Sequence, residues 1–389
     1  MSRKEPYYTL KNILMQDADY NMIYGERSNG KTTAVLRYAI EDYIKSGYEN
    51  QLAIIRRWEE DFKGKNGQQM FESIVKLGWI SDLTDGKYNS VYYYSQRWYF
   101  CHYTEDGKRD LLADLPFALG FALTAEEHYK STSYPLVKTI LFDEFITRNS
   151  YLPNEFVTFQ NLLSTIIRLR TDVKIFMCGN TINKFCPYFT EMGLLGVKKQ
   201  KKGSIDVYTY GDTTLKVAVE YSDFPTKKKA SNKYFAFNNP KLEMITNGGW
   251  EISIYPHLPQ KYKPKDVVYK FYIIFDGEML QGNIINIEDK NFLYLHRKTT
   301  PLTEDNIQLV YQQQPDYRNN YRINILKPYK KMDTYIANLI RRRKVFYQDN
   351  EIGEIMNNYL KWCSVNWWIQ RGVVWCIVFE YQNTVKMFV

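Results

Sequence analysis

The segment Gly25–Thr32 constrains this chain more than any other, because its residues GERSNGKT fit the pattern GxxxxGK[ST]. Residues 21–24 before it are strand-like, and the pattern after it predicts a helix over 32–46 that ends at Gly47. A strand, a glycine-containing loop and a helix in this order can cradle a polyphosphate, since the loop N–H groups and the helix dipole face the same anion. The alternative is a surface turn beside a lysine. The flanking strand and helix favour the cradle.

The side chains of this segment have distinct expected roles. Lys31 would reach the β- and γ-phosphates of a nucleoside triphosphate, and the Thr32 hydroxyl would ligate Mg²⁺. We therefore expect ATP and Mg²⁺ at this loop. The residues expected to contact them are Gly25, Glu26, Arg27, Ser28, Asn29, Gly30, Lys31, Thr32 and Thr33.

A second element is the apolar run at residues 139–142, which ends in Asp143 and Glu144. At the carboxyl end of a buried strand, Asp143 would lie beside the cradle and hold Mg²⁺. Glu144, one residue later, is suited to polarise an attacking water, which favours an ATP hydrolase over a small-molecule kinase. Alone, the pair could equally be a solvated strand end. The cradle upstream favours the catalytic interpretation.

Three more polar residues are candidates for contact with the γ-phosphate. Arg168 and Arg170 end a helix predicted over 154–170, from which they could project as trans-acting arginine fingers. The alternative is a pair of cations that stabilise the helix dipole. Asn180 follows a predicted buried strand at 173–178, where a γ-phosphate sensor would lie, although an asparagine that caps a turn fits the same position.

The order of predicted elements divides the chain into three parts. Residues 1–200 alternate short apolar runs with amphipathic stretches, which predicts an α/β domain with a parallel sheet flanked by helices. Residues 201–249 are rich in lysine, asparagine, proline and glycine and predict a linker or lid subdomain. Residues 250–389 contain strands followed by helices, which predicts an α+β domain.

The composition limits the partners. The chain has 52 lysines and arginines against 43 aspartates and glutamates, a formal charge of +9 that allows a polyanionic partner without requiring one. Five dispersed cysteines without a CxxC pair predict reduced thiols rather than a zinc site. No apolar run reaches the roughly 18 residues of a spanning helix, and the N-terminus does not resemble a secretory signal, so we expect no membrane partner.

Two groups of lysines are candidate contacts to nucleic acid. Lys63 and Lys65 lie in a glycine-containing loop after the second predicted strand, and Lys198 and Lys199 begin a basic run. Similar runs occur at 227–229 and 341–344. Tracking a phosphate backbone requires positive charge rather than side chains that read bases, and it depends on salt. Solvated lysine runs are the ordinary alternative.

Four stretches share a pattern with a known family. They are YGERSNGKTT, the arginine doublet in AIIRRW, KTILFDEFITRNSYLPNE and IIRLRTDVKIFMCGNTINKFCPYF. They resemble the DNA-packaging motor ATPases of phi29-like bacteriophages, which are terminase-like ASCE P-loop ATPases. The resemblance continues weakly to Trp362, and the residues beyond it are an extension. It implies an ASCE-type ATPase domain, a linker and a C-terminal domain with an RNase H-like fold that has lost its nuclease.

The resemblance also implies a function. A homo-oligomeric ring, of five subunits in this family, would use ATP to translocate viral double-stranded DNA through the portal of a procapsid, with a structural RNA as a further possible partner. Such a motor works in the host cytoplasm, transiently docked on the procapsid. By position, Asp143 falls on the Mg²⁺ carboxylate, Glu144 on the catalytic glutamate and Arg168 on the trans-acting finger, with Arg170 just behind it. The segment around Arg148 is shorter than in the family and does not align.

Two alternatives to a packaging motor stay open. One is another ring-forming nucleic-acid ATPase, such as a helicase or a replication motor, and the other is a nucleotide kinase or a nucleotide-gated binding module. A nuclease would need several carboxylates that converge on metal ions. Asp276, Glu288 and Asp289 lie near predicted strand ends, but DG at 276–277 is an ordinary hairpin turn, so we expect no nuclease activity.

Overall fold

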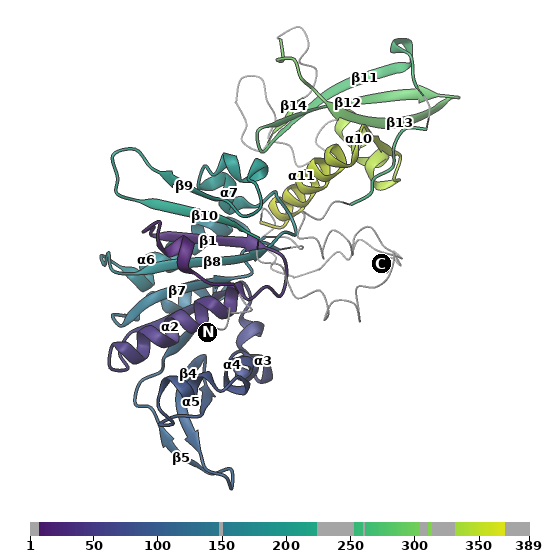
Figure 1. Ribbon diagram of the computed structural model, residues 1–389. Helices are drawn as coiled ribbons and strands as arrows, with labels where there is room; N and C mark the ends of the chain where they lie inside the picture. The colour runs from purple at the N-terminus through teal and green to yellow at the C-terminus, as the bar shows by residue number, and fades with distance from the viewer. Residues whose placement is uncertain are drawn as a thin grey trace. The chain divides into compact units, whose positions relative to one another are not determined.

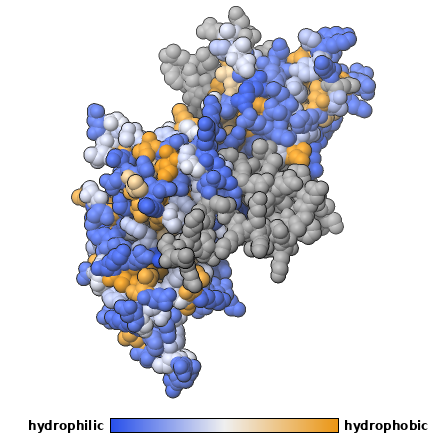
Figure 2. All heavy atoms as spheres, viewed as in Figure 1, coloured by the Kyte–Doolittle hydropathy of each residue, from blue (hydrophilic) through white to orange (hydrophobic). Residues whose placement is uncertain are grey.

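The structure is a computed structural model that describes residues 8–147, 151–223, 253–259, 261–303, 310–312 and 331–369. The chain forms two compact units, Met1–Ile252 and Ser253–Val389, and most of their helices and strands are labelled in Figure 1. On the face shown in Figure 2, hydrophobic residues of the described part are scattered among hydrophilic ones. No described helix is both long enough and apolar enough to cross a membrane.

One mixed sheet forms the centre of the first unit. Its strands are β1 (Tyr20–Gly25), β2 (Gln51–Arg56), β3 (Ser90–Tyr94), β4 (Arg97–Tyr103), β5 (Arg109–Leu112), β6 (Ala118–Ala122), β7 (Val137–Asp143), β8 (Lys174–Asn180), β9 (Ile205–Thr209) and β10 (Lys216–Ser222). Their order is β3-β4-β6-β2-β7-β8-β1-β10-β9, and β5 pairs with β4 outside this path. The strands from β6 to β10 in this order run parallel. In this order strand β8 lies between β1 and β7, which is the arrangement expected of an ASCE-type P-loop domain.

Helices cover both faces of this sheet. They are α1 (Lys11–Leu14), α2 (Lys31–Lys45), α3 (Lys65–Gln69), α4 (Glu72–Lys76), α5 (Trp79–Leu83), α6 (Glu155–Ile167) and α7 (Pro187–Glu191), with 3-10 turns η1 (Glu59–Phe62), η2 (Leu123–Tyr129) and η3 (Leu195–Lys199). One buried cluster joins α2 to one face, and a second joins α6 and α7 to the other. This arrangement confirms the predicted α/β class.

Strand β1 is an example of why the central strands are continuous apolar runs in the sequence. Ile23 belongs to one buried cluster, whereas its neighbours Met22 and Tyr24 belong to the other. Successive side chains of a strand point to opposite faces, and here both faces are covered by helices. The sequence pattern therefore predicts a buried strand directly before the loop that begins at Gly25.

Two sequence predictions about this unit are wrong in part. The predicted linker or lid over 201–249 includes β9 and β10, and β10 pairs with β1 in the middle of the sheet. The rest of that segment, from residue 224, lies outside the described residues, as do Lys227–Lys229 and Arg148. The aromatic residues 91–102 suggest one strand in the sequence, but they form a hairpin, because Ser95 and Gln96 both adopt positive φ (49° and 61°) and form a tight turn.

The second unit contains a smaller sheet and two helices. Its elements are η4 (Pro264–Asp266), β11 (Val267–Phe275), β12 (Glu278–Ile287), β13 (Lys290–Arg297), β14 (Val310–Gln312), α10 (Lys331–Arg341), β15 (Val345–Tyr347) and α11 (Asn350–Ile369). The sheet order is β14-β11-β12-β13-β15, with an antiparallel meander β11-β12-β13 and β14 parallel to β11. This confirms the predicted α+β class. Residues 373–381, which are strand-like in the sequence, lie outside the described residues.

A glycine permits close packing in this meander. A Cβ atom on Gly282 of β12 would lie 2.4 Å from the ring of Phe271, which is fully buried on β11. Because no side chain fits there, the aromatic ring can cover the glycine and the two strands can pair closely. The meander with a fourth strand parallel to its first is the arrangement that we interpret as RNase H-like.

Candidate nucleotide-binding site

The loop between β1 and α2 surrounds the amino group of Lys31. The Nζ atom donates to the Glu26 carbonyl at 2.5 Å and to Asn29 Oδ1 at 3.0 Å. The residue is 5% exposed, and burial lowers the pKa of Lys31 to about 8. Gly30, with φ 93°, caps the helix that starts at Lys31. The loop thus presents a cation and a helix N-terminus to the same place, as a polyphosphate cradle requires.

Strand β10 supports this loop from the side. A Cβ atom on Gly25 would lie 2.9 Å from the carbonyl oxygen of Ser222, and Gly25 adopts φ 155°. Asn29 Nδ2 donates to Ser222 Oγ at 3.1 Å. Gly25 is therefore required for the close approach of the two strand ends. Sequence reasoning missed Ser222 because the segment around it was predicted to be a linker.

The predicted magnesium ligands are in contact. Thr32 Oγ1 donates to Asp143 Oδ1 at 2.8 Å, and Asp143 is 8% exposed at the end of β7. A hydroxyl and a carboxylate are the oxygen ligands that a magnesium–nucleotide complex uses, with phosphate oxygens and water completing the octahedron. The two residues therefore fit the cation, and a small displacement of their oxygens would admit it. The two side chains therefore lie together, and their role as Mg²⁺ ligands stays a prediction.

Arg56 joins the two acids that end β7. Its guanidinium lies 2.7 Å from Asp143 Oδ2 and 3.1 Å from Glu144 Oε2. The Glu144 side chain is 64% exposed, and its backbone has φ 61°. Sequence reasoning did not assign Arg56 a role, although it is the last residue of β2 and opens the arginine doublet. Its position at a strand end is the sequence feature that could have identified Arg56, because β2 pairs with β7 in parallel and both strands end at the same edge.

The second arginine of the doublet fixes the backbone of Glu144. Arg57 donates to the carbonyl oxygens of Glu144 and Phe145 at 3.2 and 3.1 Å, and it forms two 2.7 Å bonds to the carboxylate of Glu155. The Arg57 side chain is 6% exposed and that of Glu155 is fully buried. Tyr188 also donates to Glu155, at 2.9 Å. This buried network holds the turn after Asp143 against the first turn of α6.

Asn180 is placed at the cradle, as predicted. It is the last residue of β8 and lies opposite Gly25 in the parallel register with β1. Its Oδ1 atom accepts a hydrogen bond from Lys31 Nζ at 3.4 Å. Lys31, Thr32, Asp143 and Asn180 thus meet at the carboxyl edge of three neighbouring strands. In open α/β sheets, ligands bind outside this edge.

A cavity of about 430 Å³ opens beside this edge. The residues that line it come from α2, β2, β7 and the segment 61–70: Thr32, Leu36, Ile54, Arg56, Asp61, Asn66, Gln69, Met70, Leu141 and Asp143. The segment with Lys63 and Lys65 therefore borders the acid side of the site. Both lysines are exposed, and Lys63 pairs with Glu59 and Glu60 at 3.4 and 3.7 Å.

The second lysine group lies on η3. Lys199 is exposed, and the Lys198 ammonium lies 5.0 Å from the centre of the Phe185 ring. Lys202, in the same basic run, contacts Glu26 of the phosphate loop at 2.5 Å and Asp223 at 3.4 Å. Part of this run thus interacts with the nucleotide-binding loop itself. The four lysines predicted to bind DNA stay predictions.

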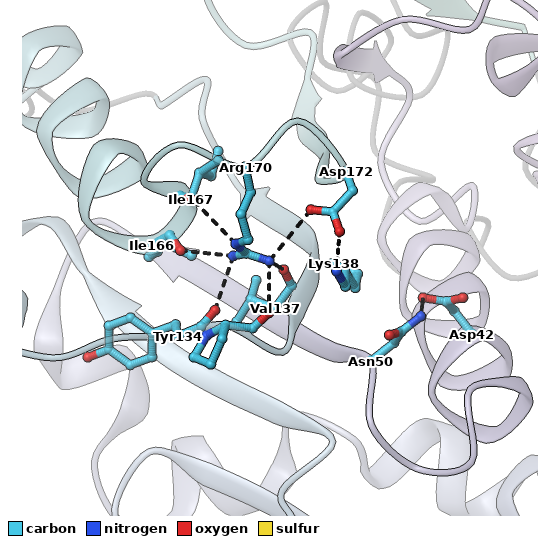
Figure 3. A network of polar contacts seen from close by, with 10 residues as sticks. Asp42, Asn50, Tyr134, Val137, Lys138, Ile166, Ile167, Arg170 and Asp172 are labelled. Atoms are coloured by element: carbon cyan, nitrogen blue, oxygen red, sulfur yellow. Dashed lines mark hydrogen bonds and ion pairs between the residues drawn. The ribbon is translucent and has the colours of Figure 1, made fainter.

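The two candidate fingers have different surroundings. Arg168 is exposed at the end of α6, where its guanidinium donates to the Thr132 carbonyl at 3.1 Å. Arg170 does not project as predicted. Its guanidinium donates to five backbone carbonyls and lies 3.8 Å from Asp172 (Figure 3). The cause is the local geometry, since α6 ends beside residues 134–137 and Arg170 fills the space between them.

Comparison with known proteins places the chain among viral packaging proteins. Residues 102–340 match the family model described as podovirus DNA encapsidation protein (Gp16). The chain is 30% identical to the DNA packaging protein of Bacillus phage B103 over 189 residues, which are 47% of this chain and 50% of that protein. It is 23% identical to the DNA packaging protein of Bacillus phage phi29 over 335 residues, 83% of this chain and 90% of that one.

Solved structures show the same fold. The Phi-28 gp11 DNA packaging motor aligns with 92% of this chain and 97% of its own, with a TM-score of 0.50 and 20% identity. The bacteriophage Phi-29 genome packaging motor assembly aligns equally well, with a TM-score of 0.50, 20% identity and coverage of 92% and 100%. At this identity the likeness establishes the fold.

Proposed function

Because the chain belongs to the podovirus DNA encapsidation protein (Gp16) family, we propose that it is an ATP-hydrolysing subunit of the motor that moves viral double-stranded DNA into a procapsid. The observation that carries this proposal is the contact between Thr32 and Asp143 beside the buried Lys31. It brings together the phosphate loop and the acid strand that an ATPase needs. The relatives are named DNA packaging proteins, which supplies the substrate class.

The donors that now form hydrogen bonds within the phosphate loop would bind the triphosphate instead. The Lys31 ammonium would exchange the Glu26 carbonyl and the Asn29 amide oxygen for β- and γ-phosphate oxygens. Thr32 and Asp143 would hold Mg²⁺, which neutralises charge on the transferring phosphoryl group. Asn180 already contacts the Lys31 amino group and would contact the γ-phosphate.

Glu144 would orient the water that attacks the γ-phosphate. Its carboxylate is exposed at the edge of the cradle, and its carbonyl is held by Arg57. In the present arrangement Arg56 occupies one oxygen of Glu144. Glu144 would have to turn away from Arg56 to present this oxygen to a water.

Completion of the site would require a neighbouring subunit. Among the described residues, Arg168 contacts none of the nucleotide-binding side chains of its own chain, and its side chain is exposed at the end of α6. An arginine supplied in trans stabilises charge on the γ-phosphoryl group during transfer. We therefore assign Arg168 to the neighbour's site in a homo-oligomeric ring. Five subunits, the portal, a structural RNA and docking on the procapsid in the host cytoplasm rest on the family resemblance.

Double-stranded DNA would be held through its phosphates. The net charge of +9 favours a polyanion, and the exposed Lys63, Lys65 and Lys199 could contact it without reading bases. Since the segment with Lys63 and Lys65 also lines the cavity beside Asp143, a contact to DNA there would be transmitted to the catalytic acids.

The second unit is proposed to lack nuclease activity. Asp276 and Glu288 lie in tight turns at positive φ, in the β11–β12 and β12–β13 connections respectively, with Asp289 beside Glu288. The two turns are at opposite ends of β12, a strand of 10 residues. At about 3.3 Å per residue, they are separated by roughly 30 Å. These three acids therefore cannot converge on one pair of metal ions.

The test is phosphate release by the purified full-length chain. We expect hydrolysis of ATP that double-stranded DNA stimulates, and that is lost in both Lys31→Ala and Glu144→Gln. Glu144→Gln should still bind nucleotide, because the cradle is intact. Nucleotide binding without DNA-stimulated phosphate release would instead support a nucleotide-gated binding module. Separation of the strands of a duplex would support a helicase.

A further inference from the structure

The turn that carries Arg168 has a conformation that its residues disfavour. Arg168 adopts φ 54° and ψ −126°, and the Arg170 amide donates to the Ile167 carbonyl at 3.2 Å. This is a type II′ turn, whose first central position favours glycine. An arginine there is strained and persists only when the surroundings impose it. The adjoining Leu169 is 100% exposed.

The Arg170 side chain bonds to the backbone on both sides of this turn. Its five N–H donors each have a carbonyl acceptor: two at the end of α6, two in the turn at 134–135 and one at Val137, the first residue of β7 (Figure 3). The acceptors are Ile166, Ile167, Tyr134, Pro135 and Val137, at 2.6 to 3.2 Å. The guanidinium therefore ties the last carbonyls of the helix to the start of β7 and to the turn before it.

We propose that Arg170 is a positioning residue, which holds the Arg168–Leu169 turn in the shape that delivers Arg168 to the neighbouring subunit's ATP. This inference rests on the proposed function of Arg168 and deepens it. Arg170 itself has no donor left for a phosphate, so it cannot serve as a second finger in this arrangement. Lysine cannot replace it, because one ammonium has three donors and lacks the planar fork that spans two segments.

The experiment uses ATP hydrolysis by full-length variants, measured over a series of protein concentrations with double-stranded DNA. Arg170→Gln and Arg170→Lys should both lose activity, by about 100-fold for a finger displaced by roughly 1 Å. Their affinity for a fluorescent ATP analogue should stay within about twofold of the original, because the cradle is untouched. Arg109→Gln, which removes an exposed arginine on β5, is the matched control and should keep full activity.

Mixing variants separates a role in the neighbour's site from a role in the variant's own site. Glu144→Gln subunits cannot hydrolyse ATP but retain an intact turn, so adding them to Arg170→Gln subunits should restore hydrolysis. Arg168→Ala subunits lack the finger and should not restore it. If Arg170 only stabilised its own domain, Glu144→Gln would give no restoration, and the inference would be overturned.

The outcomes also separate this inference from the function on which it rests. Full activity of Arg168→Ala would overturn the trans finger and the positioning role together. Loss of activity in Arg168→Ala with full activity in both Arg170 variants would overturn the positioning role alone. If thermal melting shows that Arg170→Gln does not fold, the same mixing experiment with Arg170→Lys decides, since that variant retains the charge and part of the bonding.

Discussion

Thr32 Oγ1 donates a 2.8 Å hydrogen bond to Asp143 Oδ1, which joins the first turn of the helix after the phosphate loop to the end of the acid strand. These two oxygens come from positions 111 residues apart. Arg56 binds the other oxygen of Asp143 at 2.7 Å and so fixes the carboxylate from the opposite side. The magnesium position proposed above is thus built by three elements before nucleotide arrives.

Removal of the Asp143 charge should weaken the magnesium site without unfolding the protein. Asp143→Asn keeps an acceptor for Thr32 but is a poorer ligand, so ATP hydrolysis should fall by roughly 100-fold, and half-maximal activity should require more Mg²⁺. A magnesium titration of the hydrolysis rate measures both effects. Asp110→Asn, at an exposed position on β5, is the control. An unchanged magnesium dependence in Asp143→Asn would remove this residue from the site.

The buried Lys31 should make nucleotide binding depend on pH. Burial lowers the pKa of Lys31 to about 8, and a bound triphosphate raises it again because the anion favours the charged amine. Between about pH 8 and 10 the free protein should therefore take up a proton when ATP binds. Isothermal titration calorimetry in buffers of different ionisation enthalpy counts this proton. Lys31→Met should abolish the uptake.

The same group should affect folding stability. In the unfolded chain the Lys31 amine has a pKa near 10.5, above its value of about 8 in the fold. Between these values the unfolded state binds more protons, so this residue should make the nucleotide-free protein more stable as pH rises. Urea denaturation at several pH values compares the original protein with Lys31→Met. Equal slopes for the two proteins would contradict the depressed pKa.

Replacement of only one member of the buried Arg57–Glu155 pair should strongly destabilise the protein. Arg57→Met leaves a fully buried carboxylate without its guanidinium, and we expect a loss of about 3–5 kcal/mol in the free energy of unfolding. Arg57→Met combined with Glu155→Leu should be less destabilised, because no charge remains buried. Urea denaturation of the original protein, of Arg57→Met and Glu155→Leu alone, and of the double variant gives the coupling. A double variant destabilised by the sum of the two single losses would show that the pair is not coupled.

Lys65 should contribute to DNA affinity in a salt-dependent manner. Removal of one phosphate contact lowers the slope of log affinity against log salt by about 0.9. Lys65→Ala should show this change with random-sequence double-stranded DNA. Lys76→Ala is the control, since Lys76 is exposed but pairs with Glu72 at 2.5 Å. The same slope in both variants would argue against a DNA contact at Lys65.

Leu169 should contact a neighbouring subunit. Its side chain is 100% exposed beside Arg168, and a charge there should weaken assembly while the isolated chain stays folded. In Leu169→Asp, the protein concentration for half-maximal hydrolysis should rise at least about tenfold, as expected when about 1.4 kcal/mol of contact is lost. Leu195→Asp alters another leucine, 80% exposed, and should have no such effect. Identical concentration dependence in all three proteins would place Leu169 outside the interface.

Local patterns were sufficient to predict which residues meet at the candidate nucleotide site. Lys31 and Thr32 begin the helix after β1 and its loop, Asp143 and Asn180 end β7 and β8, and the carboxyl ends of parallel strands meet at one edge. Arg57 and Glu155 were not predicted as partners, because their contact spans 98 residues and leaves no local pattern. The role of Arg170 was missed for the same reason, since three of its acceptors belong to a segment more than 30 residues earlier. Strand β10 was hidden by polar and lysine-rich neighbours, although its own residues VAVEY are strand-like.

The most direct measurement of the central claim is protection of DNA from nuclease by packaging. Purified protein, empty procapsids with their portal, double-stranded DNA and ATP are combined, and DNase is then added. The account predicts full-length protected DNA with the original protein, and none with Glu144→Gln or when ATP is replaced by an analogue that cannot be hydrolysed. Protection that persists in Glu144→Gln would contradict it, because DNA would then enter the capsid without hydrolysis at this site.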